Sequence, residues 1–109
     1  MMREQTSDTS ERGKQGWQLE RQLQRGESLE IVLGGRWCLD QALPSWELLT
    51  TELNRDGLQR IFFRTEQLDA WDTGLLAFLA GVLKFCAGRD IAVDCNGLPE
   101  GVPHLLKMA

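Results

Sequence analysis

The sequence lacks the residue patterns of a metal site, a disulfide-bonded protein and a catalytic centre. Its three cysteines, Cys38, Cys86 and Cys95, form no Cys-x-x-Cys pair, and His104 is the single histidine. Zinc sites need such pairs, so we interpret all three cysteines as buried free thiols. The sequence also has no nucleophile–base pair and no glycine-rich phosphate loop. We therefore expect a protein that is not an enzyme and that uses no metal or other cofactor.

Long apolar runs and an excess of positive charge are also missing. The longest apolar run spans residues 74–83, about half of the roughly twenty residues that cross a bilayer. The first residues include no apolar segment of the signal-peptide kind, so we expect reduced thiols and a cytoplasmic location. The formal net charge is −4, and Asp56 dilutes the arginines between residues 55 and 64. We therefore expect no nucleic-acid partner.

What the sequence does contain is typical of one small folded domain. It has 109 residues, of which 42% are hydrophobic and 26% charged, a composition that supports a core. Residues 1–16 contain no apolar residue after Met2. We predict a flexible leader over residues 1–16 and a folded domain over residues 17–109.

Apolar alternation predicts four strands. Trp17, Leu19 and Leu23 fall on one face of a strand over residues 17–23, as in a half-buried strand. A short turn joins it to an apolar strand over residues 29–33, so these two should pair as an antiparallel hairpin that ends at Gly34-Gly35. Residues 61–63 and 91–95 predict two further short strands.

Helical spacing predicts three helices between and after these strands. The first should begin near Leu43, with Pro44 in its first turn. The second should run from Thr73 to Ala87, and the third should begin at Pro103. Helices that link the last three strands imply parallel pairing. We therefore predict an α/β fold with a four-stranded mixed sheet, in which the first strand is antiparallel, the rest are parallel and the helices pack on the sheet.

A hydroxyl residue at the start of the second helix is the feature that most suggests function. Asp72 and Gly74 flank Thr73 where the chain enters this helix. A helix start presents unpaired N–H groups and a partial positive charge. The Thr73 hydroxyl can cap the helix, or it can carry a phosphate that the helix end stabilises. Asp69 and Asp72 could form an acid–base pair, but capping or solvation is the interpretation we prefer.

The second helix is apolar on two faces. One stripe, formed by Leu75, Leu79, Val82 and their neighbours, is enough to cover a sheet. A second stripe consists of Gly74, Phe78, Gly81 and Phe85. One interpretation is that the first or last helix covers this second stripe. The other is that it docks a partner protein, in which case a charge at position 78 would abolish docking and leave the fold intact.

These residues resemble a known family. The order of elements, the Gly34-Gly35 pair, the Asp72-Thr73-Gly74 helix start and the Gly97-Leu98-Pro99 segment look like a STAS domain over about residues 17–109. In STAS domains that act as anti-sigma-factor antagonists, the hydroxyl residue after the aspartate is phosphorylated, and Thr73 matches that position. The resemblance then implies partner switching with an anti-sigma kinase, controlled by phosphorylation of Thr73.

A closer resemblance is to the STAS units of MlaE-type lipid ABC transporters. The segment over residues 33–39 and the ending Gly97-Leu98-Pro99-Glu100 are similar to the form that is fused ahead of the permease. This resemblance implies a regulatory domain at the cytoplasmic face of the inner membrane, with the ATPase subunit and the membrane permease as partners. It leaves a homodimer open, and it explains why the last predicted helix stops at Ala109, since a permease would follow. The partner-binding residues would be Asp72, Thr73, Gly74, Phe78, Gly81 and Phe85.

Overall fold

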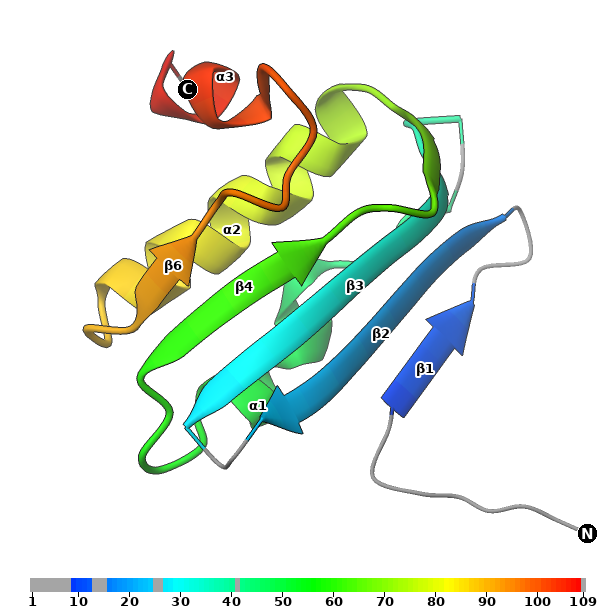
Figure 1. Cartoon of the computed structure of the whole chain (residues 1–109). Coiled ribbons are helices and arrows are strands. Elements are labelled where there is room, and N and C mark those ends of the chain that lie inside the picture. The colour runs from blue at the N-terminus through cyan, green and yellow to red at the C-terminus, as the bar shows by residue number, and fades with distance from the viewer. Residues whose placement is uncertain (1–8, 13–15, 25–26, 41, 109) are drawn as a thin grey trace, which may run out of the picture.

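The structure, a computed structural model, describes residues 9–12, 16–24, 27–40 and 42–108 (Figure 1). Within these ranges it contains six strands, one 3-10 helix and three α-helices. In chain order they are β1 (Thr9–Arg12), β2 (Trp17–Gln24), β3 (Ser28–Trp37), η1 (Trp46–Leu49), α1 (Thr50–Leu53), β4 (Arg60–Arg64), β5 (Leu68–Trp71), α2 (Thr73–Ala87), β6 (Ala92–Asp94) and α3 (Val102–Met108).

The strands form one mixed sheet in the order β1-β2-β3-β4-β6, and β5 pairs with the far end of β3. The β1–β2 and β2–β3 pairs are antiparallel, whereas β3–β4, β3–β5 and β4–β6 are parallel. The predicted α/β class and the predicted strand directions are therefore confirmed. The predicted number of four strands is too low, because β1 and β5 were not expected.

Strand β1 lies inside the segment that we predicted to be a flexible leader. Its residues Thr9–Arg12 pair antiparallel with residues 18–21 of β2. The strand is polar throughout, so it carries no alternation that would predict it. Its pairing comes from backbone hydrogen bonds to the edge of β2, which any side chain permits. The remaining leader residues, 1–8 and 13–15, lie outside the described part of the chain.

The prediction that Gly34-Gly35 ends a strand is wrong, because β3 continues to Trp37. The pairing register with β5 shifts between Gly35 and Arg36, as at a β-bulge. Gly35 has φ +76°, and a Cβ built on it would overlap the carbonyl oxygen of Gly16. A glycine therefore permits both the bulge and the close approach of the chain that enters β2.

The first helix is shorter and begins later than predicted. It starts at Trp46 as a 3-10 turn, and Ser45 is its N-cap, with the Ser45 hydroxyl accepting from the Glu47 N–H at 3.2 Å. Pro44 therefore precedes the helix instead of lying in its first turn. Leu49 and Leu53, which are four residues apart and so share one face of the helix, are both buried in the core.

The core lies between the sheet and the helices α1 and α2, which stand behind the sheet in Figure 1. Alternate residues of β2, β3 and β4 point into it, as the period of a strand requires. The largest of its fully buried side chains are Leu19, Leu29, Ile31, Leu33, Trp37, Leu49, Leu53, Ile61, Phe63, Leu75, Leu79 and Val82.

One charged residue faces this core. Arg21 follows Trp17 and Leu19 in the alternation of β2 and is 8% exposed. Its Nε atom lies 3.0 Å from Oε2 of Glu52 in α1. This ion pair links β2 to the first helix.

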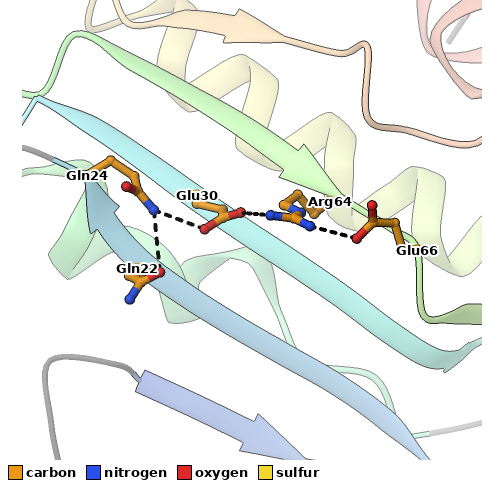
Figure 2. A network of polar contacts seen from close by, with 5 residues as sticks. All are labelled: Gln22, Gln24, Glu30, Arg64 and Glu66. Carbon is orange, nitrogen blue, oxygen red and sulfur yellow. Dashed lines mark hydrogen bonds and ion pairs between the residues drawn. The ribbon is translucent and has the colours of Figure 1, made fainter.

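The opposite face of the sheet carries a polar network, which Figure 2 shows. Glu30 is 7% exposed, accepts from Gln24 at 3.1 Å and pairs with Arg64 at 3.1 Å. Arg64 also pairs with Glu66 at 2.8 Å, and Gln24 donates to Gln22. Hydrogen bonds to Glu66 and Glu30 raise the pKa of Arg64. We call this side of the sheet the polar face.

Candidate functional site

Thr73 is the first residue of α2 and its side chain is exposed to solvent. Parallel β5 runs directly into this helix, so the end of the strand places Thr73 at an edge of the helix layer. Gly74 follows it and is buried, whereas Ala77, one turn later, is exposed. The predicted helix start is therefore confirmed to the residue.

Asp72, and not Thr73, caps the helix. The Asp72 carboxylate accepts from the Gly74 N–H at 2.8 Å. It also accepts from the backbone N–H of Leu39, with both carboxylate oxygens at 3.1 Å. A charged acceptor at a helix start satisfies free N–H groups and complements the helix dipole. The carboxylate therefore joins the start of α2 to the loop that follows β3.

This geometry predicts different costs for neighbouring substitutions. We expect Asp72→Ala to lower the free energy of unfolding by about 1–2 kcal/mol, because it removes the cap and frees the Leu39 N–H. We expect Thr73→Ala, the matched control, to change it by less than about 0.5 kcal/mol. Urea unfolding followed by circular dichroism measures both. Equal losses for the two variants would show that the hydroxyl shares in the cap.

The second apolar stripe of α2 is covered by the chain itself, which corrects its assignment as an open docking face. Phe78 is 3% exposed, and its ring meets the Trp37 ring edge-on, with centroids 4.9 Å apart. At Gly74, a Cβ would lie 2.6 Å from Leu43 Cδ1 and 3.3 Å from Leu39 Cδ2. Phe78 and Gly74 therefore belong to internal packing.

The other half of the stripe lies beneath Trp46. A Cβ built on Gly81 would overlap the Trp46 ring. The centroids of the Trp46 and Phe85 rings lie 5.4 Å apart. The Arg89 guanidinium lies 5.6 Å from the Phe85 centroid. The first helical segment thus packs over the stripe, as one of the two sequence interpretations expected, and leaves Gly81 and Phe85 half-buried.

What stays open is a shallow groove beside Thr73. Its volume is about 280 Å³. We call it the anchor groove, and its lining residues are Leu39, Leu43, Pro44, Ser45, Trp46, Gly74, Ala77 and Phe78. Leu39 forms an exposed lip, with 67% of its surface accessible. Sequence reasoning did not select Leu39 or Ala77 as site residues. The available signal was an apolar residue between Cys38 and Asp40, just beyond the end of a strand.

The predicted site residues therefore separate into two groups. Gly74 and Phe78 line the groove, and Asp72 and Thr73 adjoin it at the start of α2. Gly81 and Phe85 lie against Trp46. Asp69, the other member of the acid–base pair that we considered, is exposed on β5. Because Asp72 is engaged by two backbone N–H groups, the capping interpretation is the one that its contacts support.

The cysteines are free, and Cys86 is buried while Cys38 and Cys95 are half-buried. Burial raises the pKa of the Cys86 thiol to about 11, so it is protonated at neutral pH. Burial and the charge of Asp94 raise the pKa of Cys95 as well. Among the described residues, no three His, Cys, Asp or Glu side chains gather as metal ligands. A search of the same residues finds no helix with the length and apolar composition that crossing a membrane requires.

Comparison with models of known families gives no match for this chain, and comparison with curated proteins gives none either.

Proposed function

We propose that this chain is a non-enzymatic STAS-like interaction domain of an MlaE-type lipid ABC transporter permease. In this proposal the start of α2 docks the ATPase subunit at the cytoplasmic face of the inner membrane and helps to assemble it or tune its activity. The substrate would bind elsewhere, in the membrane part. Two features support this proposal. The Asp72-Thr73-Gly74 segment resembles the helix start of STAS domains, and the mixed sheet is compatible with that fold.

The observation that carries the proposal is the Asp72 carboxylate, which holds an exposed Leu39 beside an exposed Thr73. Leu39 packs over Gly74 at one side, and 67% of its surface stays accessible. Beside an apolar groove, it has the character of the anchors that dominate protein–protein interfaces. A hydroxyl at the same edge can donate to and accept from a partner's backbone.

Thr73→Arg tests the docking role. We expect the variant to fold normally and to lose about thirtyfold in affinity for the ATPase subunit that the proposal names as partner, as hot-spot residues do. Thr51→Arg is the matched control, because Thr51 is an exposed helical threonine on α1, and it should bind like the native domain. Calorimetric titration measures both. Native affinity of the Thr73 variant, or lack of any complex with the ATPase, would reject the proposal.

An anti-sigma-factor antagonist is the second candidate, and one observation favours it. The Thr73 hydroxyl is exposed while Asp72 supplies the cap, so a kinase could modify Thr73 without removing that cap. A phosphate would add roughly two negative charges beside Asp72 and weaken docking. Mass spectrometry of the protein isolated from its own cells distinguishes the two. A phosphate on Thr73 and a neighbouring kinase gene would favour the antagonist, whereas unmodified Thr73 beside permease and ATPase genes would favour the transporter.

A further inference from the structure

We propose that the anchor groove receives one apolar side chain of the docking partner, from a protein segment that carries lysine or arginine on either side of that anchor. This inference rests on the proposed function, since it names the chemistry of the segment that would dock beside Thr73. The size of the groove, its preformed lip and the charges around it each support it.

The size and lining of the groove fit a side chain better than a free small molecule. Its volume of about 280 Å³ lies at the lower end of the roughly 300–1,000 Å³ of small-molecule pockets. Such pockets also present several converging polar groups. Here the lining is mostly carbon, and the Ser45 hydroxyl already accepts from the Glu47 N–H at 3.2 Å. One leucine-sized or phenylalanine-sized anchor is the ligand that suits this surface.

The lip of the groove is held in place before any partner binds. Both Asp72 oxygens accept from the Leu39 N–H, and Asp40 pairs with Arg36 at 2.9 Å. Further along the same loop, the Trp17 indole donates to the Ala42 carbonyl at 2.8 Å. Contacts at Leu39, Asp40 and Ala42 hold these residues in place, so binding a partner here costs little conformational entropy. The exposed Leu39 side chain can then contact the partner directly.

The charges beside the groove are predominantly negative. No charged residue lines the groove among the described residues. The charged groups bonded to or next to its lining are Asp72, bonded to Leu39 and Gly74, Glu47, bonded to Ser45, and Asp40 with its partner Arg36. The guanidinium of Arg36 is matched by Asp40, and the partial positive charge at the start of α2 is met by Asp72. The Glu47 carboxylate then remains in excess, and it lies in the first turn of η1. A segment with basic flanks complements this rim.

The same charges disfavour the other occupants. The cation of α2 is Lys84, about 10 Å further along the helix axis than Ala77. The Arg89 guanidinium, beyond the end of α2, lies over the Phe85 ring. A second copy of the chain would bring another acidic rim and a net charge of −4, and an anionic lipid surface would be repelled in the same way. A basic protein segment is therefore the occupant to which these observations point.

Site-specific photocross-linking in the native cells tests this inference. The full-length protein carries Ala77→p-benzoyl-L-phenylalanine, and Arg60→p-benzoyl-L-phenylalanine serves as control, because Arg60 shares the polar face with Arg64. Ala77 and Arg60 are both exposed, so the fold should tolerate the probe. We expect position 77, and not position 60, to cross-link one protein segment. Peptide mapping should show an apolar residue flanked by lysine or arginine.

The possible outcomes separate the inference from the proposed function. A basic, apolar-anchored segment of a protein other than an ATPase would support the inference and reject the proposed function. An ATPase that cross-links through an acidic or wholly polar segment would support the proposed function and reject the inference. Cross-links to lipid, to a second copy, equally from Arg60, or none from Ala77 would overturn the inference.

A charge reversal gives an independent measurement once the segment is known. We expect Glu47→Lys to weaken binding of the synthetic segment about threefold to fivefold, as loss of an exposed ion pair does. Glu100→Lys, an exposed glutamate before α3, should bind like the native domain. Equal affinity of the Glu47→Lys and native proteins would contradict the proposed charge complementarity.

Discussion

Replacing Phe78 by glutamate is expected to unfold the domain, and the same change at the neighbouring Ala77 is expected to leave it folded. Phe78 is 3% exposed and packs on Trp37. Losing a buried phenyl ring costs about 3–5 kcal/mol, and burying a carboxylate in its place costs several more. That sum is comparable to the roughly 5–15 kcal/mol by which domains of this size are stable.

Ala77→Glu separates folding from docking. Ala77 is exposed at the edge of the anchor groove, so we expect the free energy of unfolding to change by less than about 0.5 kcal/mol. We expect affinity for the partner to fall, because the glutamate side chain occupies the groove. Circular dichroism with urea titration, followed by a binding titration, measures both effects. A folded Phe78→Glu domain with a native unfolding midpoint would restore the second stripe of α2 as a surface.

The packing of Trp46 on Gly81 predicts a substitution whose effect changes sign with its background. In the native protein we expect Gly81→Ala to destabilise by about 1–2 kcal/mol, because the new Cβ overlaps the indole ring. The overlap includes Cγ at the root of the ring, so the ring must move as a whole. In a Trp46→Ala background, the same substitution should stabilise by about 1 kcal/mol through helix propensity alone.

A double-mutant cycle measures this coupling, which we expect to be about 2–3 kcal/mol. All four proteins are unfolded with urea under identical conditions. Gly88→Ala is the control, because the atoms nearest its Cβ position are the Phe85 and Lys84 carbonyl oxygens at 3.6 and 3.8 Å, and its effect should not depend on Trp46. A Gly81→Ala effect of the same sign in both backgrounds would mean that Trp46 does not seal the stripe.

The sequence predicted four of the six described strands and missed β1 and β5. The alternation of Trp17 and Leu19 and the apolar runs at Ile31 and Ile61 each follow from burial against helices, so β2, β3, β4 and β6 were predicted. The polar β1 pairs through backbone groups, and backbone pairing leaves no side-chain period. Strand β5 has only four residues, and its apolar Leu68 and Trp71 are three apart, which is not the period of a strand. Beyond Gly35, strand β3 pairs with β5. The sequence did not predict β5, so it did not predict this continuation of β3 either.

The site was predictable to the extent that it is local. Asp72 and Thr73 adjoin in sequence, and a helix start after a strand predicts their position. Leu39 reaches the same place through a contact across 33 residues, which periodicity cannot anticipate. For the second stripe the sequence left two interpretations open, a cover from the first or last helix and a partner protein. Periodicity does not show that the rings of Trp46 and Trp37 lie against it.

The two faces of the sheet explain why the docking surface is expected at the helix layer. On the polar face, Glu30, Arg64 and Gln24 satisfy one another, so burial of that face would have to compensate for disrupted hydrogen bonds. At the anchor groove, burial of Leu39 removes apolar surface from water and disrupts no hydrogen bond among the groups described above. The lower desolvation cost therefore favours the groove.

The most direct test of the account is hydrogen–deuterium exchange of the domain with and without the ATPase subunit, read by mass spectrometry. Docking at the start of α2 predicts slower amide exchange in peptides over residues 38–46 and 73–78, and unchanged exchange in strands β2 and β4. Protection confined to β2 and β4, or identical exchange over residues 38–46 and 73–78 in the two samples, would contradict it.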